Sequence, residues 1–181
     1  NFGKGNPHNP NGINVSYMWE RIWTKDNILF LIERFIYIKK KESRNPDTGK
    51  IKKTKELIFP RFHQLRAVER VMNDVIINHT SCNYLIEHSA GSGKTETISW
   101  LAHILATVHD DANQNIFDSV LVITDRIVVD RQLQEAITSI EHKSGQVKVM
   151  DDKCDSEDLA GALGGNTKII VTTIHKFYYI L

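Results

Sequence analysis

Residues 84–95, YLIEHSAGSGKT, decide the fold class of this chain. The run begins with apolar residues, continues through small ones and ends in Gly93-Lys94-Thr95. A phosphate-binding P-loop has the pattern G-x-x-x-x-G-K-[ST] and joins a strand to a helix. Here the closing triplet is intact, while His88 replaces the first glycine. Small residues at 90–93 still let backbone N–H groups turn inward around phosphate oxygens, so the run predicts a nucleotide site.

Each part of this loop has a chemical task in nucleotide binding. The ammonium group of Lys94 would reach the β- and γ-phosphates of ATP, and the Thr95 hydroxyl would be a ligand of Mg²⁺. The following helix adds the partial positive charge of its N-terminus. We therefore expect ATP and Mg²⁺ as cofactors and take Lys94 and Thr95 as catalytic candidates. The ATP-binding candidates are Phe62, Gln64, Ser89, Ala90, Gly91, Ser92, Gly93, Lys94, Thr95 and Glu96.

Helical and strand patterns alternate on both sides of the loop. Helices are expected at 62–78, 93–108, 128–140 and 157–163, and strands at 84–88, 119–124, 147–150 and 168–173. The strands at 119–124 and 168–173 are almost continuously apolar, which is typical of a parallel sheet buried on both faces. The sequence therefore predicts a doubly wound α/β domain with flanking helices over residues 59–181.

Residues 1–58 have a different character and are expected to form an extension before this domain. Residues 1–14 are rich in Gly, Pro and Asn, which predicts a linker. Apolar spacing predicts a helix over 26–38, with Asp26 able to cap it. Residues 39–55 hold eight Lys or Arg around a turn sequence at 45–49, which makes a hairpin plausible. That basic stretch is either a solvated hairpin or a contact with a phosphate backbone.

Composition limits the other possibilities. The chain has 181 residues, 41% of them hydrophobic, which is enough for one ordinary core, and its net charge of +1 creates no global attraction to nucleic acid. Cys82 and Cys154 have no metal-ligand spacing and are expected to be free thiols. We expect no membrane span, no secretory signal and a cytoplasmic location. Because the chain lacks an initial Met and ends in apolar residues, we expect it to be part of a longer protein.

Polar residues follow the predicted strands and precede the loop. Gln64 lies about 30 residues before Lys94, and its amide can contact adenine N6 and N7, with Phe62 near the base. Alone, Gln64 would be an exposed helix residue. Thr124 and Arg126 follow one strand, and Thr172 and Thr173 end another, at the sheet edge where α/β proteins bind ligands. Strand termination and helix capping are the simpler interpretation of these threonines.

Several motifs in order resemble the motor region of type I restriction enzyme R subunits, which are superfamily 2 DNA translocases. The matching runs are Arg61-Phe62-His63-Gln64, residues 84–95, Ile123-Thr124-Asp125-Arg126 with Asp130-Arg131-Gln132-Leu133, and residues 170–177. Gly5-Asn6-Pro7 and Tyr17-Met18-Trp19-Glu20 resemble the join that precedes that motor. A His at the first P-loop position is usual in the family, whereas His175 departs from its frequent Gln.

The resemblance implies a first RecA-like P-loop NTPase lobe over 59–181, incomplete before its Walker B motif. It implies that Gln64 reads adenine and that residues 91–95 hold phosphates and Mg²⁺. It also implies contacts with the backbone of one DNA strand, from Thr124, Arg126, Thr172, Thr173 and Lys176. The implied partners are double-stranded DNA and the modification (methyltransferase) and specificity subunits of a restriction complex, with no membrane. The parent chain would be an ATP-dependent type I site-specific deoxyribonuclease.

Two kinds of catalytic group are missing from the sequence. No Asp-Glu-x-x motif follows an apolar strand, and we find no carboxylate-and-lysine nuclease motif. We therefore expect these 181 residues to bind nucleotide but neither to hydrolyse ATP at a useful rate nor to cut DNA. The alternatives are a superfamily 2 helicase or remodeller without a nuclease, a P-loop kinase-type protein, and a noncatalytic DNA-binding module.

Overall fold

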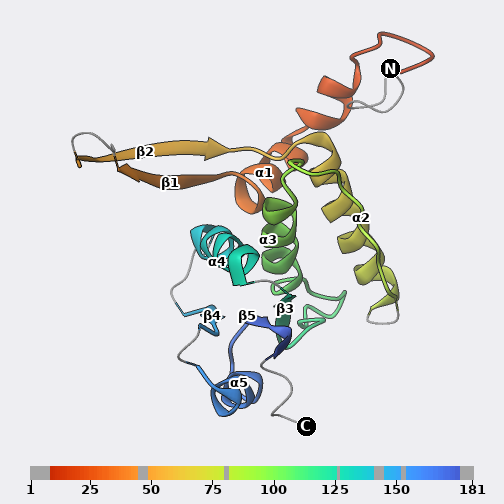
Figure 1. Ribbon diagram of the computed structural model, residues 1–181. Helices are drawn as coiled ribbons and strands as arrows, with labels where there is room; N and C mark the ends of the chain where they lie inside the picture. Colours follow the sequence, from red (N-terminus) through yellow and green to blue (C-terminus); the bar gives the residue numbers. More distant parts are fainter. Residues whose placement is uncertain are drawn as a thin grey trace. The chain divides into compact units, whose positions relative to one another are not determined.

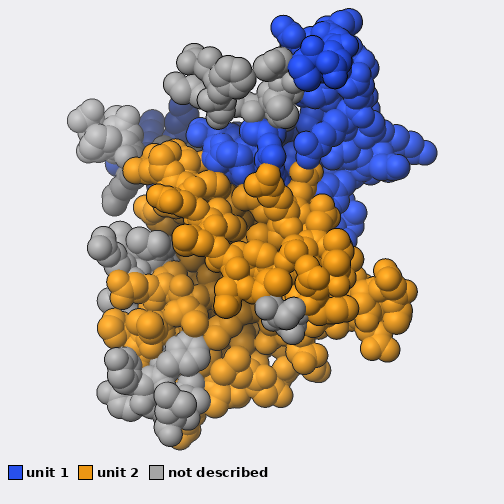
Figure 2. All heavy atoms as spheres, turned by 90° about the vertical axis from the view of Figure 1, so that its right-hand side faces the viewer, with its two compact units in different colours: residues 1–66 blue, residues 67–181 orange. Residues whose placement is uncertain are grey.

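The structure, a computed structural model, describes residues 9–44, 49–79, 82–125, 127–140, 145–151 and 154–175. The chain divides into two compact units, residues 1–66 and residues 67–181, coloured blue and orange in Figure 2. Helix α2, Phe62–Asn78, runs from the first unit into the second. It has the bounds that the sequence predicts. None of the described helices combines the length and apolar composition needed to cross a lipid bilayer.

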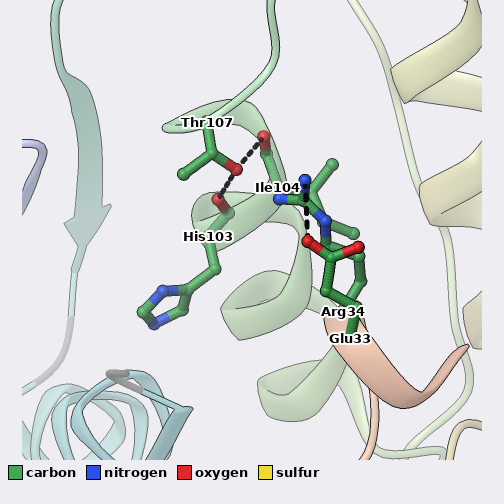
Figure 3. Close-up of polar contacts among 5 residues, drawn as sticks. All are labelled: Glu33, Arg34, His103, Ile104 and Thr107. Atoms are coloured by element: carbon green, nitrogen blue, oxygen red, sulfur yellow. Dashed lines mark hydrogen bonds and ion pairs between the residues drawn. The ribbon is translucent and has the colours of Figure 1, made fainter. Parts of the chain in front are cut away.

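The first unit is built from two short helices and a hairpin. A π-helical turn, η1 (Met18–Ile22), precedes α1 (Lys25–Arg34). The prediction that Asp26 caps α1 is wrong, because the helix begins one residue earlier and Thr24 is at the N-cap position. Asp26 lies instead in the first turn, where its carboxylate interacts favourably with the helix dipole. The Arg34–Glu33 ion pair (3.4 Å) drawn in Figure 3 is solvent-accessible, so it contributes little to stability.

The hairpin predicted around the basic stretch is confirmed. Strands β1 (Tyr37–Arg44) and β2 (Ile51–Ile58) pair antiparallel along their whole length, from Tyr37 opposite Ile58 to Arg44 opposite Ile51. They form the two-stranded ribbon visible in Figure 1. The turn residues 45–48 lie outside the described residues. At the base of the ribbon Tyr37 is buried, as are Leu31 and Phe35.

A three-stranded parallel sheet forms the centre of the second unit (Figure 1). Its order is β3 (Val120–Thr124), β5 (Ile169–Thr173) and β4 (Val147–Val149), so the last strand in sequence lies in the middle. The connections are helices: α4 (Ile127–Ile140) joins β3 to β4, and α5 (Ser156–Leu163) joins β4 to β5. This alternation confirms the predicted parallel α/β class.

The sheet is covered on both faces. On one face Val122, Ile169 and Val171 pack against α4 and against α3 (Lys94–Leu105). On the other face Ile170 packs against Leu159 and neighbouring residues of α5. Successive strand residues point to opposite faces, so apolar residues at every position give each layer its own half of the core. This is the arrangement that the continuous apolar strands predict.

Local hydrogen bonds hold the helix ends in this unit. Asp155 and Asp158 form a reciprocal capping box at the start of α5, with N···O distances of 2.9 and 3.1 Å. At the end of α3, the Thr107 hydroxyl donates to the carbonyl oxygens of His103 and Ile104, as Figure 3 shows. The His103 ring lies 2.8 Å from the Ile137 carbonyl oxygen in the last turn of α4. Since that oxygen can only accept, the ring Nε2 carries the proton, and the bond ties α3 to α4.

One predicted strand is wrong. Residues 84–88 have no strand pairing in the structure, and Leu85 is 92% exposed. The segment packs against α2 and does not join the sheet. The Tyr84 hydroxyl donates to the Asp74 carboxylate (2.5 Å), and Ile86 packs against Val71 and Val75. An apolar run of this length fits a strand or any apolar groove, because strand preference depends on the partner that the fold supplies.

The cysteine prediction is confirmed: Cys82 and Cys154 are free thiols. Partial burial raises the pKa of the Cys154 thiol, with a smaller contribution from its hydrogen bond to Asp151. Among the described residues, no group of three His, Cys, Asp or Glu side chains is placed to hold a metal ion.

The Tyr84–Asp74 bond predicts an unusual tyrosine titration. The bond raises the pKa of Tyr84 to about 12 and lowers the pKa of the Asp74 carboxyl. The folded state thus holds the phenol proton more tightly than the unfolded chain. The contribution of this bond to stability is complete below pH 10, the ordinary tyrosine pKa, and disappears as the pH rises towards 12. The chain has five tyrosines, and tyrosinate absorbance follows their titration. Asp74→Asn should return the highest tyrosine pKa towards 10, and Tyr84→Phe should remove that titration from the curve. An unchanged titration in Asp74→Asn would contradict the bond.

The two-sided core predicts a large difference between two isoleucines of the same sheet. Ile170 is 0% exposed on β5, whereas Ile123 is 48% exposed on β3. Ile170→Ala should lower the free energy of unfolding by about 2–5 kcal/mol, because it removes buried methyl groups and leaves a cavity. Ile123→Ala, the matched control, should cost about 1 kcal/mol or less. Urea unfolding followed by circular dichroism measures both, and equal losses would contradict the assigned core.

Candidate functional site

The loop before α3 has the backbone geometry of a phosphate-binding turn. Gly93 is the N-cap residue of α3, with φ 84° and ψ 40°, and Gly91 has φ 70°. Both φ values lie in the left-handed region, which residues other than glycine adopt only at a cost in free energy. The two glycines therefore turn the chain sharply into the helix. The first N–H groups of an α-helix have no acceptor within the helix, so the turn presents donors suited to an anion.

The loop is accessible to a ligand. Ser89, Ala90 and Gly91 are exposed, and Ser92 and Gly93 are half-buried. At the start of the helix, Lys94 is exposed while Thr95 and Glu96 are half-buried. All the sequence-predicted phosphate-binding residues thus lie in one continuous turn at the start of one helix, as the motif requires.

The ammonium group of Lys94 lies over the loop. Its Nζ donates to the carbonyl oxygens of Ser89 (2.9 Å) and His88 (3.2 Å). These bonds fold the side chain back towards the turn rather than out into solvent. A phosphate oxygen would compete well for the same donors, because hydrogen bonds between ionised groups are roughly twice as strong as bonds to a neutral acceptor. The position of Lys94 therefore suits a nucleotide phosphate.

Two residues of α3 support the loop, and the motif search did not select them. The hydroxyl of Thr97 donates to the Gly93 carbonyl (3.2 Å), and that of Ser99 donates to the Thr95 carbonyl (2.8 Å). Both side chains are buried. Each bond joins a residue to the one four positions earlier, so it fixes the turn that carries Lys94 and Thr95. The sequence feature that could have identified them is a Ser or Thr four residues after Gly93 and after Thr95.

The chain offers Mg²⁺ one ligand in this region, the Thr95 hydroxyl. Magnesium at nucleotide sites is usually bound by few protein groups and completes its shell with phosphate oxygens and water. A half-buried hydroxyl in the first turn of the helix fits that pattern. The residues present therefore suit magnesium delivered with a nucleotide.

Gln64 and Phe62 lie at the start of α2, in the first unit. The expectation that Gln64 by itself would be an exposed helix residue is wrong, because it is 4% exposed. Its Oε1 accepts a hydrogen bond from the Arg61 backbone N–H (2.8 Å), which caps the helix. The Arg66 guanidinium lies 5.7 Å from the centre of the Phe62 ring. These contacts hold both side chains in defined orientations.

The threonines at the strand ends divide between the two faces of the sheet. Thr124 and Thr173 are directly paired at the carboxyl ends of β3 and β5, so the structure brings them together. Thr172 precedes Thr173 and points to the opposite face, where it is 0% exposed. Thr124 and Thr173 are each 8% exposed. Arg126 and Lys176, the two cationic candidates for DNA contact, lie outside the described residues.

A cleft of about 660 Å³ lies between α2 and residues 82–87. Its polar lining includes Arg70, Asp74 and Glu87, and Leu85 and Ile86 form part of its apolar lining. Glu87 is the last lining residue before the phosphate-binding turn. The lining thus ends directly before the loop and includes none of residues 88–95.

Comparison with known proteins agrees with this geometry. Residues 63–179 match the family model described as SWI2/SNF2 ATPase, which covers more than half of the chain. No curated protein and no solved structure gave a significant match. The matched region contains the phosphate-binding turn, α3 and the whole parallel sheet. The chain therefore belongs to the SWI2/SNF2 ATPase family, whose members are helicase-like superfamily 2 motors that use ATP.

Proposed function

We propose that this chain is part of the ATP-dependent DNA translocase motor of a type I restriction endonuclease R subunit. ATP would bind at the turn before α3, with Mg²⁺ on the Thr95 hydroxyl. ATP binding and hydrolysis between two lobes would move the motor along double-stranded DNA, and the parent complex would cleave that DNA. Modification and specificity subunits would be its protein partners.

The observation that carries the motor function is the geometry around Lys94. The left-handed Gly93, the exposed loop and the ammonium group over two loop carbonyls together support a site for nucleotide phosphates. Family membership supports the same chemistry. A P-loop kinase-type protein would share the loop geometry but not the family match, and a noncatalytic DNA-binding module has neither support.

The restriction assignment depends on finer sequence features. His88 at the first P-loop position and the run Arg61-Phe62-His63-Gln64 resemble R subunits, as does Tyr17-Met18-Trp19-Glu20 before the motor. Another superfamily 2 helicase or remodeller without a nuclease is the second candidate, and the SWI2/SNF2 match supports it equally. The two candidates share the nucleotide site and differ in whether the DNA is cut.

DNA would follow the carboxyl edge of the sheet. Thr124 and Thr173 are brought together there, and Arg126 and Lys176 follow the same two strands in the sequence. Contacts with phosphates from such positions would hold the DNA without reading its sequence. A translocase needs this property, because it must accept every sequence along its path.

Nucleotide binding predicts protection of the chain against heat. A ligand that binds only the folded state at 100 times its Kd stabilises by about 2.7 kcal/mol, or roughly 5–10 °C in Tm for a chain of this size. Mg-ADP should produce such a shift, measured by scanning calorimetry, and Lys94→Ala should abolish it.

Lys168→Ala is the matched control. Lys168 lies just before β5 in the same unit, and its ammonium group also donates to a backbone carbonyl, that of Asp118. The Lys168→Ala variant should keep the full shift. An equal shift in Lys94→Ala would refute the phosphate site. No shift in the unsubstituted chain would refute nucleotide binding itself.

The choice between restriction motor and remodeller is decided by cleavage. The protein encoded by the whole gene, purified with its modification and specificity subunits, should cut unmethylated plasmid DNA only when ATP is present. Lys94→Ala in that protein should abolish both ATP hydrolysis and cutting. DNA-stimulated ATP hydrolysis with intact plasmid would instead establish the remodeller.

A further inference from the structure

Positive charge is concentrated in the β1–β2 hairpin. Residues 37–58 contain eight basic and three acidic residues, a net charge of +5, whereas the whole chain carries +1. The rest of the chain therefore carries −4. The two units of the chain thus differ in charge as well as in fold. A surface of this kind attracts polyanions at short range, although the chain as a whole is nearly neutral.

The two faces of the hairpin are not equivalent. The register places Lys40 directly opposite Lys55, and Lys53 lies on the same face opposite Glu42, so the like-charged Lys40–Lys55 pair is what distinguishes this face. On the other face Lys39 lies opposite Glu56, which is an opposite-charge pair. Cross-strand neighbours have Cβ atoms roughly 5 Å apart, where like charges destabilise a hairpin. Lys40 and Lys55 are both exposed, so a polyanion on this face would relieve the repulsion between them.

One face of the ribbon is also more accessible at its base. Tyr37 is buried on the face that carries Lys39, whereas Ile38 and Leu57 are exposed on the face that carries Lys40 and Lys55. The lysine face is therefore open at the base of the hairpin. We define the ribbon face by the exposed residues Ile38, Lys40, Lys53, Lys55 and Leu57, and the register adds Glu42 opposite Lys53.

The form of the hairpin suits duplex DNA. A two-stranded β-ribbon fits the major groove of B-DNA, which is about 12 Å wide. Eight residues in each strand extend roughly 27 Å at about 3.4 Å per residue. Proteins that bind single strands stack bases on aromatic side chains. The hairpin has one aromatic residue, Tyr37, and it is buried.

We propose that the ribbon face is a second DNA-binding surface, which contacts the phosphates of duplex DNA without sequence preference. Lysines make this contact as point charges and read no bases. The inference rests on the proposed function only for the choice of DNA as the polyanion. The surface itself lies in residues 37–58, outside the matched ATPase region 63–179.

The test is the salt dependence of binding to a fluorescein-labelled 30-base-pair duplex, measured by anisotropy with the 181-residue chain. Each lost phosphate contact lowers the slope of log K against log salt by about 0.9. Lys40→Ala/Lys55→Ala should therefore lower the slope by about 2 and weaken binding at least about tenfold at 0.1 M salt. Lys40→Arg/Lys55→Arg should keep the slope of the unsubstituted chain.

The matched control removes the same charge from the other face. Lys39→Ala/Lys52→Ala should leave the slope nearly unchanged. Equal losses in the two double variants would overturn the assignment to one face, and no loss in either would overturn DNA binding by the hairpin. Tighter binding to a single strand of equal length, or equal competition by polyglutamate, would also overturn it.

Folding and nucleotide binding are followed in the same proteins. Lys40→Ala/Lys55→Ala should unfold at the temperature of the unsubstituted chain or above it, because the substitution removes a repulsion. Lys39→Ala/Lys52→Ala should unfold at nearly the temperature of the unsubstituted chain, because a solvent-accessible opposite-charge pair contributes little to stability. Mg-ADP protection should be intact in both. If protection is present and duplex binding is absent, this inference fails while the nucleotide site stands. If Lys94→Ala loses protection and keeps the salt slope, the two surfaces act separately.

Discussion

The second unit depends on the burial of strand β5. All five of its residues are buried, and it pairs with β3 on one side and β4 on the other. A strand in this position must be apolar towards both helical layers, since each face of a parallel sheet is covered. Ile169 and Val171 meet this requirement on the face of α3 and α4, and Ile170 meets it on the face of α5. The central strand therefore joins the two halves of the core.

The same sheet holds the C-terminal half of α3, the helix whose first turn carries the proposed nucleotide site. Ala102 and Ala106 pack α3 against the sheet and α4, and the His103–Ile137 hydrogen bond ties α3 to its neighbour. Thr97 and Ser99 then hold the first turn through bonds to Gly93 and Thr95. A phosphate-binding turn needs this support, because its exposed backbone donors must be held in place before the anion arrives.

The chain has two surfaces that are suited to different kinds of anion. The second unit presents backbone donors and one lysine, which suit a compact phosphate group. The hairpin presents repeated lysines along an extended ribbon, which suit a regular polyanion. The proposed DNA translocase would need both, because ATP would be held at one site while the DNA contacts formed and broke along the track.

The sequence by itself determined the features that depend on the spacing of residues close together in the chain. It determined the loop, the helix α2, the hairpin and the parallel sheet, because turn residues, apolar periods and capping groups act within a few residues of one another. Only the tertiary structure decided which partner residues 84–88 take, since an apolar run is satisfied equally by a strand or by the side of α2. The same holds for Gln64, whose burial depends on helix packing, and for the burial of Thr172 and Thr173, which depends on what covers each face of the sheet. Each of these depends on which distant surface meets the residue, and that information is absent from its sequence neighbours.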